Sequence, residues 1–122
     1  MIHSRFGTGL LAAAALAALT GCHSYHIDTT IENRTGGAVK QIEVDYPSAS
    51  FGADTIAAGA DFHYRFQVQD SGPIKVDYTE ADGRTATATG PTLAQGQEGR
   101  LEIILLPEAK VEFEPELTLG RN

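Results

Sequence analysis

Apolar and polar residues alternate with a period of two along most of the chain after residue 24. Successive side chains of a β-strand point to opposite faces of a sheet, so each alternating stretch predicts a strand with one buried face. The segment 61–69 is the clearest case, because Phe62 and Phe66 fall on one face while His63 and Arg65 fall on the other. The strands predicted in this way are 25–32, 39–46, 51–56, 61–69, 74–79, 84–89 and 100–106.

Turn-forming residues separate the predicted strands at regular intervals. Gly36-Gly37 follows the first strand, Asp82-Gly83 is typical of a hairpin, and Gly90-Pro91 is expected to end the strand before it. Strands at this spacing, with no helical period beyond residue 22, predict an all-β fold, a single antiparallel β-sandwich. An immunoglobulin-like Greek key is the expected version, although the paired cysteines and the tryptophan of antibody domains are absent. A small barrel or a transthyretin-like sandwich is the alternative, because one sequence does not reveal strand order.

The first 22 residues follow a different pattern. Arg5 precedes the segment 6–20, which contains no charged residue and consists largely of Ala and Leu. As a helix this segment is about 22 Å long, which is shorter than the roughly 30 Å hydrocarbon core of a bilayer. A basic start followed by a short apolar run is typical of a secretory signal peptide, so we expect an N-terminal signal helix.

The signal segment ends in Leu19-Thr20-Gly21-Cys22. This run resembles the lipobox of bacterial lipoproteins. The resemblance implies that the Cys22 thiol receives diacylglycerol, that the signal is cleaved after Gly21, and that the new amino terminus is acylated, typically with palmitate. It also implies a lipid anchor in the bacterial cell envelope. His23 is not the Asp that retains lipoproteins in the inner membrane, so the periplasmic side of the outer membrane is expected if the organism is diderm.

The chain is therefore divided into four segments. These are the signal peptide 1–21, a lipidated cysteine with a short tether 22–25, the β-sandwich 26–107, and an acidic edge strand or tail 108–122. In that last segment Glu112, Glu114 and Glu116 project on one side if the chain is extended. Their like charges discourage pairing with another sheet edge, and no calcium-loop pattern accompanies them.

The chemistry of the mature domain offers few candidates for a reaction. His23 and His26 have the spacing H-x-x-H, but at i and i+3 on a strand they point to opposite faces, so no metal site is expected. No serine lies in a nucleophile motif, and no glycine-rich loop precedes a helix. The net charge of −7 argues against a nucleic-acid partner. We therefore expect a protein that is not an enzyme and has no catalytic residues, metal or cofactor.

The function predicted from the sequence is a membrane-anchored module that binds or scaffolds, most simply as an adaptor for another envelope protein. The alternative is a solute- or carbohydrate-binding module, which the absence of tryptophan disfavours. A pocket lined by several of the four tyrosines would support that alternative; they are Tyr25, Tyr46, Tyr64 and Tyr78. With so short a tether, we expect Arg34 and Lys40 to face the membrane and the acidic C-terminal segment to face away.

Overall fold

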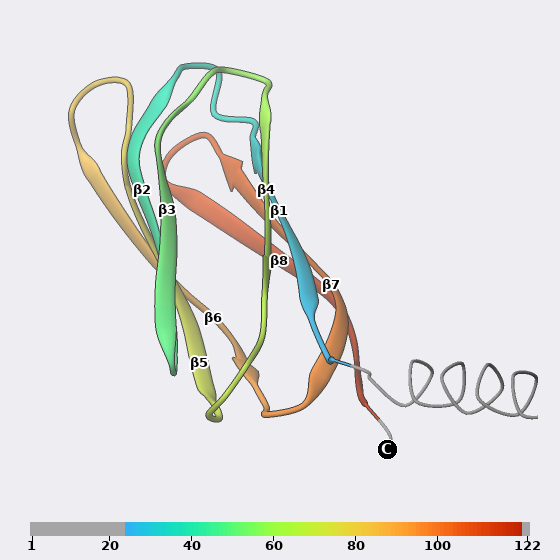
Figure 1. Ribbon diagram of the computed structural model, residues 1–122. Helices are drawn as coiled ribbons and strands as arrows, with labels where there is room; N and C mark the ends of the chain where they lie inside the picture. Colours follow the sequence, from blue (N-terminus) through green and yellow to red (C-terminus); the bar gives the residue numbers. More distant parts are fainter. Residues whose placement is uncertain (1–23, 121–122) are drawn as a thin grey trace, which may run out of the picture.

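The computed structural model describes residues 24–120, which form eight β-strands in two layers (Figure 1). The strands are β1 (Ile27–Asn33), β2 (Val39–Tyr46), β3 (Ala49–Ile56), β4 (Asp61–Phe66), β5 (Gly72–Thr79), β6 (Thr85–Leu93), β7 (Gln97–Leu106) and β8 (Lys110–Leu119). One sheet has the order β4-β1-β7-β8 and the other the order β3-β2-β5-β6. The predicted β-sandwich is thereby confirmed. The predicted signal helix lies outside the described residues.

The strand order distinguishes between the versions of the sandwich considered above. β1 and β2 lie in different sheets, whereas the first two strands of an immunoglobulin constant domain share one sheet. Within residues 24–120, β1 and β7 pair in parallel and the other five strand pairs are antiparallel. The strand order of this sandwich therefore differs from that of an immunoglobulin constant domain.

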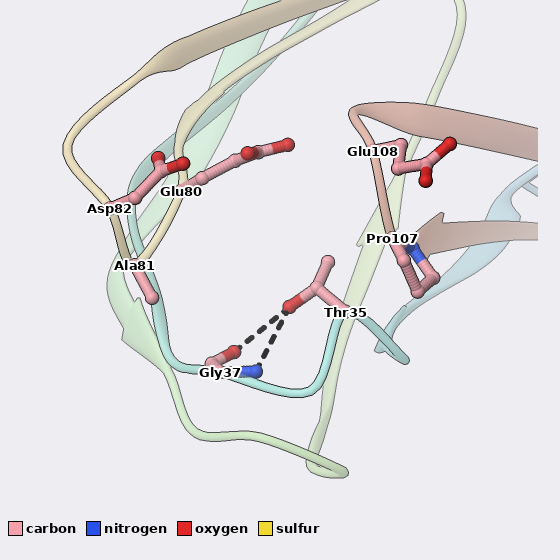
Figure 2. A pocket seen from close by; sticks show the side chains of 7 residues that line it. All are labelled: Thr35, Gly37, Glu80, Ala81, Asp82, Pro107 and Glu108. Carbon is pink, nitrogen blue, oxygen red and sulfur yellow. Dashed lines mark hydrogen bonds between the residues drawn. The ribbon is translucent and has the colours of Figure 1, made fainter.

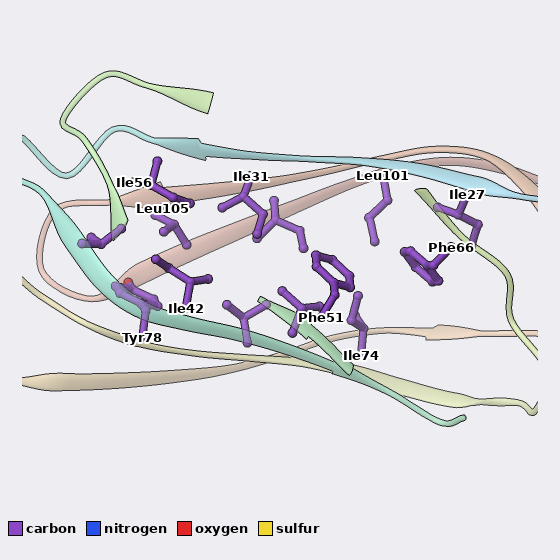
Figure 3. Close-up of a cluster of buried hydrophobic side chains, with 14 of the residues drawn as sticks. Ile27, Ile31, Ile42, Phe51, Ile56, Phe66, Ile74, Tyr78, Leu101 and Leu105 are labelled. Carbon is purple, nitrogen blue, oxygen red and sulfur yellow. The ribbon is translucent and has the colours of Figure 1, made fainter. Parts of the chain in front are cut away.

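The core lies between the two sheets and is built from the apolar set of each alternating stretch. Figure 3 shows these side chains filling the space between the layers, with Ile27, Ile31 and Leu101 from one sheet. Ile42 and Ile74 come from the other sheet, and all five side chains are at most 2% exposed. Fully burying one such side chain stabilises a protein by roughly 1.5–3 kcal/mol, so the alternation specifies both the strands and the side on which they pack.

The predicted end of one strand, at Gly90-Pro91, is wrong. β6 does not end before Gly90-Pro91 but continues through it to Leu93. Proline is tolerated here because β6 is an edge strand, and the pairing register with β5 shifts between Pro73 and Lys75, opposite this site. Gly90 also leaves room for the Phe113 ring of β8, since a Cβ atom on Gly90 would lie 2.6 Å from that ring.

The acidic C-terminal segment is an edge strand. β8 pairs with β7 along its whole length, from Leu106↔Lys110 to Gln97↔Leu119. It also helps to close the open side of the sandwich, because Phe113 and Leu117 pack against the core. The structure therefore has one strand more than the seven predicted from the clearest alternation.

The two ends of the sandwich carry different loops, and the described chain begins and ends at the same one. We call one the proximal end, because the described chain begins and ends there (Figure 1). The amide of Gly120 donates to the carbonyl of Gly96 at 2.8 Å, and that of Gly99 to the carbonyl of His26 at 3.2 Å. Three loops lie at the proximal end: 47–48, 67–71 and 94–96. Four loops lie at the opposite, distal end: 34–38, 57–60, 80–84 and 107–109.

Candidate functional site

The predicted lipidation residue, Cys22, lies outside the described residues, and so does His23. The description begins at Ser24, three residues before β1. Among residues 24–120, no helix is long and apolar enough to cross a membrane.

The two described histidines, His26 just before β1 and His63 on β4, make separate local contacts. The ring Nδ1 of His26 lies 3.2 Å from the carbonyl oxygen of Ser24. His63 is exposed on β4, and its Nδ1 lies 3.0 Å from the hydroxyl of Thr30 on β1. His63 is therefore a surface side chain, as predicted.

The tyrosines do not line one common pocket. Tyr78 is 2% exposed and belongs to the core, while Tyr25 lies against Gly120 at the proximal end. Tyr46 packs on Phe66 with ring centroids 4.3 Å apart. Tyr64 is 41% exposed, but one face of its ring stacks on Phe51 at 4.2 Å. These rings close the side of the sandwich between β3 and β4.

Acidic side chains cover the outer face of β8, as predicted. Glu112, Glu114 and Glu116 are all exposed there. Glu116 accepts a 2.8 Å hydrogen bond from Arg100. Glu114 lies opposite Glu102 on β7, and a hydrogen bond between their side chains, with the neighbouring negative charges, raises the pKa of Glu114.

A second acidic group lies on the outer face of the other sheet, and sequence reasoning missed it. Carboxylate oxygens of Glu43, Asp45 and Asp77 lie within 4.8 Å of one another. They come from two strands whose pairing the sequence does not reveal. Asp77 already accepts a 2.6 Å hydrogen bond from Thr87 and lies 3.7 Å from the ammonium of Lys75. These neighbours offset its charge, and we assign no metal to the group.

A cleft opens between the two sheets at the distal end. Figure 2 shows one half of it, with Glu80 of the loop 80–84 pointing toward the loop 107–109, which carries Glu108. Its two adjoining hollows have volumes of about 200 and 260 Å³, and both are lined by Glu80 and Glu108. Thr35 borders the first hollow and Arg84 the second. We call this feature the distal cleft.

The polar groups of the distal cleft differ in how well they are paired. Asp82 accepts hydrogen bonds from the backbone amide of Arg84 at 3.0 Å and from its Nε at 2.8 Å. These bonds lower the pKa of Asp82. By contrast, Oε1 of Glu80 is buried and has no hydrogen-bond partner among the described residues. The same is true of the Tyr78 hydroxyl, whose pKa is raised by burial and by the negative charge of Glu80.

A buried asparagine fixes the loops at the distal end. Asn33 is 0% exposed, and its side-chain amide donates to the carbonyls of Gly37 at 2.8 Å and Ile56 at 2.9 Å. Its Oδ1 accepts from the hydroxyl of Thr35 at 2.7 Å and from the backbone amide of Thr35 at 3.1 Å. One side chain thus ties the loop 34–38 to the end of β3. The sequence contained one indication that Asn33 is buried: it continues the inward-facing series of Ile27 and Ile31.

Comparison with known proteins identifies a fold but no family. No protein family matches the chain, and no curated protein matches it significantly. A solved structure described as "NMR structure of the protein from Eubacterium rectale" is similar, with a TM-score of 0.55 and 19% sequence identity. The match covers 78% of this chain and 90% of that one. At this level of identity the likeness is one of fold alone.

Proposed function

We infer that this protein is a bacterial envelope lipoprotein, anchored through acylated Cys22, whose β-sandwich is a non-catalytic adaptor for another protein. The observation that carries the inference is the run Leu19-Thr20-Gly21-Cys22 at the end of an uncharged segment. Several acyl chains, each contributing about 0.8 kcal/mol per buried CH₂, hold a protein firmly on a membrane. The favoured address is the periplasmic face of the outer membrane.

The position of the first strand supports a defined orientation of this anchored domain. Residues 22–26 extend at most about 17 Å, which keeps the proximal end close to the lipid surface. β1 contains seven residues, so it carries the chain about 23 Å away from that end. Arg34 follows β1 and lies at the distal end, together with Lys40 near the start of β2. For a domain anchored at Cys22, this position argues against the expectation that Arg34 and Lys40 face the membrane.

The composition of the proximal end suits contact with a lipid surface better than the charge of the whole chain suggests. The three proximal loops consist mainly of Ser, Gln, Pro and small residues, and Asp70 is the one charged residue in them. Anionic headgroups repel negative protein charges within a Debye length of roughly 8 Å. The proximal loops, with so little charge, can rest there, while the distal loops point toward the periplasm and toward a protein partner.

Replacement of the anchor cysteine tests this proposal. We expect Cys22→Ser to abolish labelling by radioactive palmitate and to move the protein from the membrane fraction to the soluble fraction. As a control, Ser24→Cys in the Cys22→Ser background restores a thiol but not the lipobox spacing, so it should not restore labelling. Equal labelling of the wild type and of Cys22→Ser would contradict the anchor. Density-gradient separation of the two membranes then tests the outer-membrane address.

A further inference from the structure

Leu119 is a large apolar side chain that the sandwich leaves uncovered. It lies at the end of β8, in the alternating series that also contains Phe113 and Leu117, and those two side chains pack against the core. Leu119 itself is 64% exposed, and the other exposed large apolar residue among residues 24–120 is Tyr64, at 41%. Single apolar side chains are common on protein surfaces, so the exposure of Leu119 is informative only through its position.

Leu119 lies close to the predicted lipid anchor. β8 ends beside the point where the described chain begins (Figure 1). Gly120, the next residue after Leu119, lies against the ring of Tyr25, and a Cβ atom on Gly120 would overlap that ring. Tyr25 follows Cys22 by three residues, which span at most about 11 Å. If Cys22 is acylated, the lipid surface is therefore within reach of the Leu119 side chain.

The surroundings of Leu119 carry little net charge. The loop 94–96 is hydrogen-bonded to the residue after β8 and contains no charged side chain. On the outer face of the same sheet, Arg100 donates a 2.8 Å hydrogen bond to Glu116. Asp28 lies 3.6 Å from Arg65 on that face, so the four charges offset one another in two pairs. Repulsion by lipid headgroups is therefore weak around Leu119.

The two side chains at this place suit two depths of a bilayer. Leucine gains free energy when its surface moves from water into the hydrocarbon region. Tyrosine combines an apolar ring with a polar hydroxyl, and it is enriched at the level of the headgroups. Tyr25 is half-buried against the end of β8, so its ring lies beside the exposed Leu119 and not in the core.

We propose that Leu119 inserts into the bilayer next to the acyl chains on Cys22, with Tyr25 at the level of the headgroups. This inference rests on the anchor proposed above and adds a contact that the folded domain itself makes with lipid. A lipidated cysteine attaches the chain at one point and leaves the domain free to turn about its tether. A second attachment on β8 limits that rotation and keeps the proximal end on the membrane.

Tryptophan fluorescence tests the insertion, because the chain has no tryptophan of its own. Leu119→Trp introduces one at the proposed contact, and Tyr64→Trp introduces one at the other exposed apolar position as a matched control. The acylated full chains are reconstituted into phosphatidylcholine vesicles with or without bromine on the acyl chains. This zwitterionic lipid avoids repulsion of Asp70 and Glu98. Bromine quenches tryptophan on contact, so Leu119→Trp should lose most of its fluorescence in brominated vesicles and Tyr64→Trp should keep it.

A second set of variants gives a measurement that needs no tryptophan. In nanodiscs with a spin label on the lipid headgroup, Leu119→Ser should reduce the broadening of the Gln95 amide signal, because the domain loses its second attachment. Leu119→Phe keeps an apolar side chain and should retain the broadening of the wild type. Tyr64→Ser is the control for removing an exposed apolar group elsewhere and should leave the broadening unchanged. Thermal unfolding confirms that each variant is folded.

Three results with a vesicle-bound chain would overturn the insertion: no quenching of Leu119→Trp, equal quenching of both tryptophans, or unchanged broadening of Gln95 in Leu119→Ser. Flotation with the vesicles and the mass of the chain distinguish these results from failure of the anchor. A chain that floats and carries acyl groups but shows no quenching of Leu119→Trp would contradict the insertion alone. A chain without acyl groups that does not float would contradict the anchor and the insertion together.

Discussion

The two ends of the sandwich are built from loops of similar length but opposite character. The proximal loops carry Asp70 as their one charged residue, whereas the distal loops carry charges of both signs. The charged residues of the distal loops are Arg34, Glu80, Asp82, Arg84 and Glu108. Charged groups arranged on a fixed surface supply specificity and steer association. The difference supports the proposal that the distal end meets a partner and the proximal end rests on the membrane.

The hydrogen bonds that hold the loops differ in the same way. At the distal end the bonds converge on one wholly buried side chain, Asn33. At the proximal end they are made by exposed side chains, such as the hydroxyl of Ser48, which accepts from the amide of Gln69 at 3.4 Å, and that of Ser71, which accepts from Gln95 at 3.3 Å. Water can replace an exposed bond but not a buried one. The loops 34–38 and 57–60 are therefore fixed in shape before any partner binds.

The largest expected effect comes from removing the buried asparagine. Asn33→Ala leaves the carbonyls of Gly37 and Ile56 without their side-chain donor, so the free energy of unfolding should fall by about 3 kcal/mol. Asn33→Asp should cost a similar amount, because it keeps the volume but places oxygen against those carbonyls. Chemical denaturation measures both. The proximal control, Ser48→Ala, should cost less than about 0.5 kcal/mol.

An equal decrease in the free energy of unfolding in Asn33→Ala and Ser48→Ala would contradict the difference between the two ends. A large loss in Asn33→Ala with almost none in Asn33→Asp would indicate that Asn33 fills space and that its hydrogen bonds contribute little.

Most of the fold follows from local pattern. The alternation in 39–46 predicted β2 with both of its boundaries, and the inward positions of Ile42 and Val44 are buried as expected. Asp82-Gly83 correctly predicted the β5–β6 hairpin, where Gly83 has a φ of 90°. Burial of an alternating face is a strong local constraint, so a single sequence is enough to reveal it.

The strand order and the candidate site were not predictable in this way, because both depend on pairings between distant segments. Glu80 falls between the predicted strands 74–79 and 84–89, and only the fold brings it to a cleft that Glu108, far away in the sequence, also lines. Gly90-Pro91 was expected to break a strand because the edge position of β6 could not be known. Asparagine is common in turns, so its type did not reveal that Asn33 is buried, and this burial depends on the neighbouring loops.

A smaller effect on stability is expected from changing Glu114, which lies on the outer face of β8 and in neither set of end loops. Its hydrogen bond to Glu102 raises its pKa in the folded protein, so folding favours its protonated form. That contribution to stability is present at low pH and is lost as pH rises through the raised pKa. Glu114→Gln keeps a donor for Glu102 at every pH. It should therefore raise the melting temperature at pH 7, and this gain should shrink toward pH 5.

Melting curves of the wild type and of Glu114→Gln at the two pH values measure this difference. A gain that does not depend on pH would contradict proton sharing between Glu102 and Glu114. The Asn33→Ala variant, which changes no titratable group, should show the same pH dependence as the wild type if it is folded.

The most direct test of the account is the orientation of the domain on a bilayer. The acylated protein, labelled for NMR, is placed in lipid nanodiscs that contain a phospholipid with a spin label on its headgroup. We predict strong broadening of the amide signals of Gln69 and Gln95 at the proximal end, and little broadening for Ala58 and Ala81 at the distal end. Equal broadening at both ends, or stronger broadening at the distal end, would contradict the claim that the distal end is presented to a partner.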